Sequence, residues 1–240
     1  TSTTVAQPLK EIGSICSRFD AISFVDATAS IVGMDLPVDE WKLDAVSVGL
    51  QKCLAGPPGI APITFNDRVA SIINLRKHIE LGIRPKGFES ATGRTIASNY
   101  FDLGMLMDYW SESRLNHHTE ATSMLYAARE CARIVLKEGL KECSERHADA
   151  SRAMVAGLEA MGLSIFGDKK HKMPNVTGCY IPEGVKSEQV RMDLLQDFGI
   201  EIGTSFGPLD GKIWRIGLMG ETSKKESIQR LMDAFRQILY

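Results

Sequence analysis

The sequence has few cysteines and no pattern that pairs them. Its five cysteines are scattered over 240 residues and none forms a C-x-x-C pair; they are Cys16, Cys53, Cys131, Cys143 and Cys179. A disulfide framework or a cysteine-based zinc site would need closer and more regular spacing. We therefore expect free thiols, a reducing cytoplasmic location and no bound metal.

Long apolar runs and an excess of one charge are also absent. No run of residues approaches the ~18 apolar positions that a membrane-spanning helix needs. The 28 basic and 30 acidic residues are well mixed and give a net charge of -2, so we expect neither a nucleic-acid surface nor a basic membrane face. The 44% of hydrophobic residues is enough for the core of a globular protein.

Hydrophobic spacing in the first half predicts helices that alternate with strands. Residues 21–26 are apolar on both faces, as buried parallel strands are. The expected elements are a helix at 8–20, strands at 21–26, 43–50 and 61–65, and a helix at 66–81. This alternation predicts an α/β fold.

The second half has a different pattern, which predicts a smaller α+β unit. A loop rich in Gly, Ser and Thr at 82–100 precedes it, and long loops in compact enzymes are often functional. The later elements are helices at 120–140, 147–161, 187–198 and 224–240, and strands at 174–181 and 212–218. We expect a large α/β domain at 1–135 and a small α+β domain at 136–240.

Two charged residues stand where expected strands end. Lys52 follows the strand at 43–50 and precedes a Gly-Pro-Pro-Gly turn, and Asp26 closes the strand at 21–26. A lysine amine can form a Schiff base with the aldehyde of pyridoxal 5′-phosphate, whose ring nitrogen needs a carboxylate partner. Ligands of α/β sheets bind at the carboxyl ends of strands. The pair predicts a site for this cofactor, although Lys52 alone could be a solvated turn residue and Asp26 alone a turn cap.

Five separated segments resemble, in the right order, the alanine–glyoxylate and serine–pyruvate aminotransferase family, class V of fold type I. They are TSTTVAQPL at 1–9, VDATASIVG at 25–33, DAVSVGLQKCLAGPPG at 44–59, HHT at 117–119 and WRIGLMG at 214–220. The resemblance runs through all 240 residues, with a longer loop near 84–100. It implies a pyridoxal-phosphate-dependent transaminase with a mostly parallel sheet in its large domain, a smaller C-terminal α+β domain, and a homodimer with a shared active site.

The resemblance also implies roles for residues around the cofactor. Lys52 resembles the Schiff-base lysine that moves the proton between Cα and the cofactor, and Asp26 resembles the partner of the ring nitrogen. Gln51 resembles a ligand of the cofactor phosphate, and Thr1 resembles a hydroxyl residue near the ring oxygen or the phosphate. Thr119 resembles a phosphate contact that is supplied by the neighbouring subunit.

Two further residues concern the substrate. Arg215 resembles the arginine that binds the substrate carboxylate, a group that a guanidinium fork holds bidentately; a structural salt bridge is the alternative. Asn116 precedes HHT where alanine–glyoxylate enzymes usually carry Tyr, and NHHT resembles the (S)-ureidoglycine–glyoxylate aminotransferase branch of purine breakdown. An amide can both donate to and accept from a urea group, so we expect Asn116 to bind ureidoglycine, with glyoxylate as the amino acceptor. Asn116 and Thr119 could instead cap the following helix.

Other functions stay open at this point. An alanine– or serine–glyoxylate enzyme would use the same residues. A cysteine desulfurase is disfavoured because Gln51 rather than His precedes Lys52, and because Cys179 lies in an expected strand. A non-catalytic dimerising remnant is disfavoured by the intact set of Lys52, Asp26 and Arg215. His117 and His118 are adjacent, so we expect their side chains to point apart and to bind no metal.

The resemblance implies a longer protein than the sequence given. The family's phosphate-binding glycine turn and the aromatic residue that stacks on the cofactor ring lie upstream of the segment at 1–9. No secretory signal pattern is visible, and the chain starts at Thr1 rather than Met. We expect further residues upstream, and a chain that truly began at Thr1 would hold the cofactor poorly.

Overall fold

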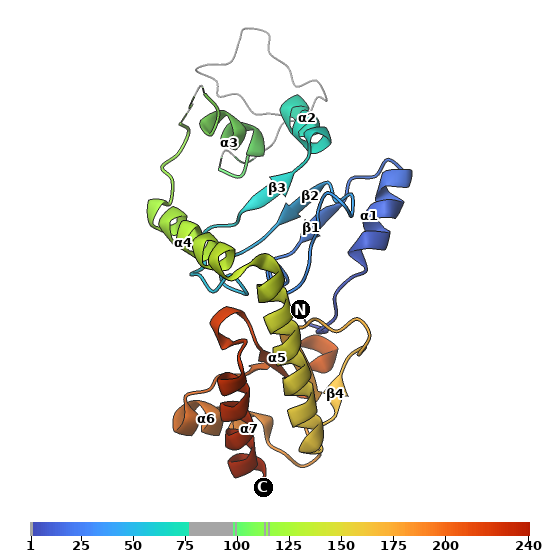
Figure 1. Cartoon of the computed structure of the whole chain (residues 1–240), viewed down its shortest axis with the longest axis vertical. Helices are drawn as coiled ribbons and strands as arrows, with labels where there is room; N and C mark the ends of the chain where they lie inside the picture. Colours follow the sequence, from blue (N-terminus) through green and yellow to red (C-terminus); the bar gives the residue numbers. More distant parts are fainter. Residues whose placement is uncertain (1, 77–97, 99, 113, 115) are drawn as a thin grey trace.

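The computed structural model describes residues 2–76, 98, 100–112, 114 and 116–240 (Figure 1). Two sheets form separate halves of the molecule, with the N-terminal sheet above and the C-terminal elements below in this view. The elements before residue 110 are α1 (Leu9–Arg18), β1 (Phe24–Asp26), β2 (Ala45–Ser47), β3 (Ile63–Phe65), α2 (Asp67–Arg76) and α3 (Leu103–Tyr109). The later helices are α4 (Thr122–Glu138), α5 (Leu140–Ala160), α6 (Ser187–Phe198) and α7 (Lys225–Leu239).

The upper sheet has the order β1-β2-β3. Strands β1 and β2 are parallel, whereas β2 and β3 are antiparallel. Each expected strand is present, but only three residues of each are paired. The expectation that residues 21–26 are buried on both faces is wrong, because Val25 packs into a core with Leu43 and Val46 while the Phe24 side chain is 64% exposed.

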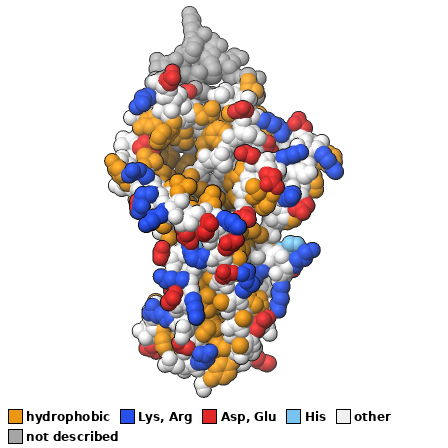
Figure 2. Space-filling view, viewed as in Figure 1, with side chains coloured by type: hydrophobic (Ala, Val, Ile, Leu, Met, Phe, Trp, Pro, Cys, Tyr) orange, Lys and Arg blue, Asp and Glu red, His pale blue; other side chains and the backbone are white. Residues whose placement is uncertain are grey.

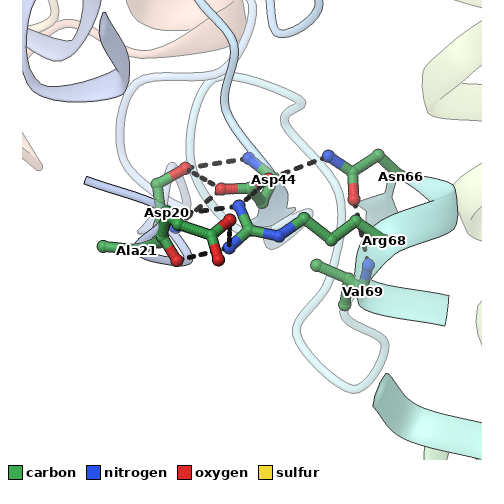
Figure 3. Close-up of polar contacts among 7 residues, drawn as sticks. Asp20, Ala21, Asp44, Asn66, Arg68 and Val69 are labelled. Atoms are coloured by element: carbon green, nitrogen blue, oxygen red, sulfur yellow. Dashed lines mark hydrogen bonds and ion pairs between the residues drawn. The ribbon is translucent and has the colours of Figure 1, made fainter. Parts of the chain in front are cut away.

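The amino ends of β1 and β2 are tied together by a buried carboxylate. Asp44 is 7% exposed. Its Oδ2 accepts hydrogen bonds from Ser23 N at 2.8 Å and Ser23 Oγ at 3.0 Å, and its Oδ1 accepts one from Asn66 Nδ2 at 2.9 Å. Figure 3 shows Asp44 between Asn66 and the guanidinium of Arg68, whose Nη1 lies 3.7 Å from Asp44 Oδ1. Because Asn66 directly follows β3, one side chain joins all three strands.

The lower sheet has the order β4-β5-β7-β6 and is antiparallel throughout. Its strands are β4 (Ile165–Phe166), β5 (Val176–Tyr180), β6 (Gly203–Thr204) and β7 (Ile213–Gly217). Trp214 of β7 stacks on Phe235 of α7 at 5.5 Å inside a core that also contains Met154 and Leu158 of α5. The expected strands at 174–181 and 212–218 are present; β4 and β6 were not predicted, because two residues carry no periodicity.

The two halves meet where α4 ends and α5 begins. Gly139 separates these helices with a φ of 103°, so α5 starts seven residues before the expected position at 147. The proposed domain boundary between residues 135 and 136 falls inside α4, and the division into two domains stays a prediction. Residues near the N-terminus lie against the lower half, since Val5 forms a β-bridge with Lys172.

Some sequence expectations fall on residues that the structure does not describe. Thr1, residues 77–81 of the expected helix at 66–81, and almost all of the loop at 82–100 lie outside the described residues. Within the described part of the chain, no helix combines the length and the apolar character that crossing a membrane requires.

We expect Asp44→Asn to lower the thermal unfolding midpoint, because an amide would turn donor hydrogens toward Ser23 and leave a buried donor unpaired, which costs ~1–3 kcal/mol. Burial acts to raise the pKa of Asp44, but hydrogen bonds from Ser23 and Asn66 and the charge of Arg68 outweigh it and lower the pKa. This stabilisation is therefore present above the ordinary pKa of 3.8 and is lost as the pH falls through the lower folded value.

The control for this experiment is Asp20→Asn. The Asp20 side chain is 95% exposed, although it pairs with Arg68 at 2.8 Å, so its loss should cost about 0–1 kcal/mol. Equal shifts of the melting midpoint for both variants would contradict this account of the network. So would a loss of stability in Asp44→Asn that persists at a pH well below the pKa of Asp44 in the folded protein.

Candidate active site

The carboxyl ends of β1 and β2 lie side by side and set the position of the site. Asp26, the last residue of β1, is in register with Ser47, the last residue of β2. Ala27 N donates to Ser47 O at 2.8 Å, which carries the pairing one residue past β1. The loops after the two strands therefore begin next to each other, at the sheet edge where α/β folds bind ligands.

Asp26 presents a charged carboxylate at this edge. Its side chain is exposed, and its Oδ1 accepts a hydrogen bond from Thr28 N at 2.9 Å. Hydrogen bonds from the Thr28 side chain and backbone lower the pKa of Asp26, against a smaller opposing effect of burial. Asp26 thus caps the turn that follows β1, as the alternative interpretation held. Because its carboxylate is also exposed and ionised, it can in addition bind a cationic group of a ligand.

Lys52 lies in a tight turn that follows β2. Ala55 N donates to Lys52 O at 2.9 Å, and Gly56 N donates to Leu50 O at 2.8 Å. Leu50 and Cys53 are buried on either side of the half-buried Lys52. Buried neighbours and backbone bonds therefore fix the backbone from which the amine projects.

Gly49 lies between the two loops. A Cβ at Gly49 would lie 2.5 Å from Gln51 Oε1 and 2.9 Å from Thr28 Cγ2. The side chains of Thr28 and Gln51, one from each loop, thus both lie close against Gly49. Sequence reasoning singled out Gln51 but not Thr28 or Gly49; the position of Thr28 two residues after Asp26 was the available signal.

Arg215 lies on β7 and is half-buried. Its Nε donates to Thr204 O at 2.7 Å, and its guanidinium lies 5.8 Å from the ring centre of Phe206. Among the residues that the structure describes, Arg215 forms no ion pair. The alternative of a structural salt bridge therefore has no support there, and the guanidinium retains donors for a carboxylate.

The chain that leaves β7 returns to the Lys52 turn. Gly220 packs so closely on this turn that a Cβ at Gly220 would lie 2.6 Å from Ala55 Cβ. Five residues at a strand rise of about 3.3 Å place Arg215 within ~17 Å of Gly220. The strand that carries Arg215 in the lower half of the molecule therefore continues directly into a segment that packs on the Lys52 turn.

Asn116 and Thr119 lie in the segment before α4, and both are exposed. Asn116 Oδ1 accepts a hydrogen bond from His118 N at 3.1 Å. Helix α4 begins at Thr122 and its N-cap, Ala121, makes no side-chain cap, so neither Asn116 nor Thr119 caps this helix. Helix α4, which follows this segment, packs on the Lys52 loop: a Cβ placed at Gly59 would lie 3.0 Å from Met124 Sδ, and one placed at Gly56 would lie 2.6 Å from Cys131 Sγ.

The adjacent histidines of this segment lie against each other. The ring centres of His117 and His118 are 4.4 Å apart with the planes at 65°, so the expectation that they point apart is wrong. His118 also packs against Tyr109 at 5.5 Å, and its Nε2 lies 3.5 Å from Glu120 Oε1. Within the described ranges, no group of three His, Cys, Asp or Glu side chains could hold a metal ion.

The cysteines are unpaired and unsuited to nucleophilic roles near the site. All five are free thiols. Cys179 is fully buried in β5, and burial raises its pKa to about 12. Burial likewise raises the pKa of Cys53 to about 11. Neither thiol is available as the nucleophile that a desulfurase would need.

Comparison with known proteins places this arrangement in a family. The model of the class-V aminotransferases matches residues 1–209. The chain is 54% identical over 241 residues to the (S)-ureidoglycine–glyoxylate transaminase of Bacillus subtilis (strain 168), covering 100% of this chain and 58% of that protein.

Solved structures agree with the sequence comparison. The crystal structure of ureidoglycine–glyoxylate aminotransferase from Bacillus subtilis superposes with a TM-score of 0.90 at 52% identity and covers 99% of this chain and 57% of that one. The alanine–glyoxylate aminotransferase of Nostoc sp. gives 0.87 at 34% identity, with 100% and 59% covered. The expected fold type I is confirmed, and the chain spans a little more than half the length of these relatives. The chain belongs to the class-V aminotransferase family, as its separated motifs implied.

Proposed function

We propose that the protein of which this chain is part is a pyridoxal-phosphate-dependent aminotransferase that moves an amino group from (S)-ureidoglycine to glyoxylate, in purine breakdown. One observation carries the proposal: the parallel pairing of β1 with β2 brings Asp26 and the Lys52 turn to one edge of the sheet. The donor is suggested by the relative from Bacillus subtilis, which is named for ureidoglycine and glyoxylate, and by Asn116 before His117.

The residues at this edge fit pyridoxal 5′-phosphate. The exposed carboxylate of Asp26, held ionised by Thr28, suits a protonated ring nitrogen. A Cβ at Gly49 would collide with Thr28 and Gln51, so the glycine lets polar side chains from both loops lie at the edge where the cofactor would bind. When bound, the cofactor supplies an aldehyde for an amine and a ring that accepts electrons.

The remaining roles follow from the chemistry of each side chain. Lys52 Nζ would hold the cofactor and, once displaced by the donor, take the proton from the donor Cα. Arg215 would hold the substrate carboxylate with the guanidinium donors that face no described carboxylate, and so orient the Cα–H bond. Gln51 and Thr1 would contribute to holding the cofactor. Two substrates that use one site in turn give ping-pong kinetics.

A homodimer follows from the role proposed for Thr119, which would reach the phosphate of the cofactor held by the partner subunit. Its support in the structure is that Thr119 is exposed and that exposed apolar side chains flank α3 and lie on α4: Phe101, Trp110, Tyr126 and Leu136. Figure 2 shows hydrophobic side chains around a hollow in the upper half of this face. A second copy would cover such surface.

The cytoplasm is the proposed location, supported by the five free thiols. The two-domain division at residues 1–135 and 136–240 is proposed from the two separate sheets. An alanine– or serine–glyoxylate aminotransferase is the second candidate function, favoured by the high structural similarity to the Nostoc enzyme named for alanine and glyoxylate.

We expect Lys52→Ala in the full-length protein to abolish the visible absorption band of the cofactor, because Lys52 is the amine that the proposal places in the turn after β2 for the Schiff base. Lys10→Ala, at an exposed lysine of α1, is the control and should keep the band. Absorption spectra of both variants after addition of pyridoxal phosphate test this. A normal band in Lys52→Ala would remove the cofactor role of Lys52 and the proposed function with it.

The amino donor is tested by single half-reactions of the full-length protein without glyoxylate. Bleaching of the cofactor band should be far faster with fresh (S)-ureidoglycine than with alanine or serine. Asn116→Tyr should slow the ureidoglycine reaction by about 10-fold or more. The urea group would lose its amide partner, and a polar group left without a partner in a site costs ~1–3 kcal/mol. Bleaching by alanine or serine instead would favour the second candidate, and unchanged ureidoglycine rates in Asn116→Tyr would contradict the role of Asn116.

We expect Arg215→Lys to reduce kcat/KM for glyoxylate by roughly 10- to 150-fold, the range of one charged hydrogen bond of ~1.5–3 kcal/mol. Lysine keeps the charge but loses both the fork and the bond to Thr204 O. Arg191→Lys is the matched control, because Arg191 Nε also donates to a carbonyl, Ile202 O at 3.1 Å, but on α6. Similar kinetic losses in the two variants would show that Arg215 acts only through the fold.

A further inference from the structure

The backbone of Gly220, five residues after Arg215, is hydrogen-bonded by two consecutive residues of α5. Gly220 N donates to His147 Nε2 at 3.1 Å, and Gly220 O accepts from Arg146 Nη1 at 2.8 Å. The same Arg146 Nη1 also lies 3.1 Å from Ser223 O. Both polar groups of one glycine are therefore held by one turn of α5, and we call Arg146, His147 and Gly220 the Gly220 latch.

The two α5 side chains of the latch are themselves fixed. His147 is fully buried at 0% exposure, and its Nδ1 lies 2.7 Å from Cys143 O. A carbonyl oxygen can only accept, so Nδ1 carries the hydrogen and Nε2 is free to accept from Gly220 N. Arg146 forms a bidentate pair with Glu138 at 2.5 and 3.0 Å, which ties the latch to the last turn of α4.

The opposite side of Gly220 is pressed against the Lys52 turn. A Cβ at Gly220 would lie 2.6 Å from Ala55 Cβ and 3.2 Å from Cys53 O, and the φ of Gly220 is 57°. Both the space and the backbone conformation therefore require glycine here. The residue next to the proposed catalytic lysine, Cys53, is in direct contact with the latch.

The same junction reaches the loop after Asp26. Asn175 Nδ2 donates to Ala29 O, and Cys53 Sγ lies 3.7 Å from this carbonyl. Leu218 N, between Arg215 and Gly220, donates to Asn175 O at 2.9 Å. The chain that leaves β7 is thus linked through Asn175 to the loop after β1, and it packs on the loop after β2.

We propose that His147 and Arg146 are positioning residues that set the place of Arg215 relative to Lys52 by clamping Gly220 onto the Lys52 turn. The inference rests on the proposed function for the roles of Lys52 and Arg215. A substrate held by its carboxylate at one residue and attacked at its Cα by another reacts well only when the two are correctly spaced. Neither His147 nor Arg146 belongs to any of the motifs that carry the family resemblance.

The latch depends on pH through His147, because a protonated ring has no acceptor for Gly220 N. The titratable and charged groups around the ring are Cys143 and Arg146 on α5, Glu138 on α4, and Cys53 in the Lys52 turn. Burial lowers the pKa of His147 below 6.5, with the positive charge of Arg146 acting in the same direction and Cys143 O and Glu138 against it. The latch is therefore intact above the ordinary pKa of 6.5 and opens as the pH falls through the lower folded value.

The test is hydrogen exchange of the full-length protein without added cofactor, read in the peptides that contain residues 217–223 and 50–56. At about pH 7.5, where His147 is neutral, His147→Leu should speed exchange at Gly220 by about tenfold, the factor for one lost hydrogen bond. Exchange at Ala55 and Gly56 should rise with it. His147→Gln, whose Oε1 can take the place of Nε2 as acceptor, should restore most of the protection.

Met154→Ala is the matched control, because Met154 is equally buried on α5 but packs in the lower core. It should destabilise the protein without changing the ratio of exchange between 217–223 and 50–56. Faster exchange at 217–223 with wild-type exchange at 50–56 in His147→Leu would overturn the proposal, since the clamp would then not reach Lys52. If His147→Leu does not fold, Arg146→Lys, which loses the bidentate pair with Glu138, replaces it with the same two outcomes.

The pH dependence gives a second, independent readout. As the pH is lowered through the depressed pKa of His147, wild-type exchange at Gly220, corrected for the intrinsic rate, should accelerate, and KM for glyoxylate should rise while the cofactor band stays. His147→Gln cannot protonate and should show neither change; an identical acid response in this variant would refute the role of His147. Hydrogen exchange is measured without cofactor, so it tests the Gly220 latch independently of the proposed function. Absence of a cofactor band in the full-length protein would refute the proposed function without affecting the result for the latch.

Discussion

The parallel pairing of β1 with β2 is the constraint on which the rest of the site depends. Asp26 and Ser47 are opposite each other in that register, so the loops after the two strands start within hydrogen-bonding distance, as the bond from Ala27 N to Ser47 O shows. A slip by one residue would turn Asp26 to the other face of the sheet. This pairing places the carboxylate of Asp26 and the start of the loop that carries Lys52 at one edge of the sheet, where we propose that the cofactor binds.

The opposite ends of the same strands carry the stabilising contacts. Asp44 joins Ser23, Asn66 and Arg68 at the amino ends of β1 and β2, whereas the side chains proposed to act on the cofactor follow the carboxyl ends. The buried, hydrogen-bonded carboxylate of Asp44 and the exposed, ionised carboxylate of Asp26 therefore lie at opposite ends of a sheet whose strands are three residues long. Substitutions at the first should change stability, and those at the second should change chemistry.

Much of the fold could be predicted from the sequence because the helices have clear apolar faces and alternate with apolar segments that contain the strands of three to five residues. The short strands β4 and β6 could not, since two residues show no period, and the exposure of Phe24 could not, since an apolar side chain in a strand does not report what covers it. For the site, the motifs predict roles for Asp26, Gln51, Lys52 and Arg215, and these roles stay predictions. Thr28, Gly49 and the Gly220 latch were missed, because their roles arise from contacts between distant segments rather than from spacing along the chain.

Glycine plays the same part at both contacts that hold the site together. At Gly49 the missing side chain lets Thr28 and Gln51 approach across the two loops, and at Gly220 it lets the return from β7 press on the turn that carries Lys52. The first contact lies within the upper half of the molecule, where we propose that the cofactor binds. The second joins the two halves, and it bears on the proposed substrate site because β7 carries Arg215. In the proposed reaction one half holds the substrate carboxylate and the other acts on the adjacent carbon, which requires such a contact. The hydrogen bonds of the half-buried Arg146 and the fully buried His147 to Gly220 explain why the junction can be rigid although one of its members has no side chain.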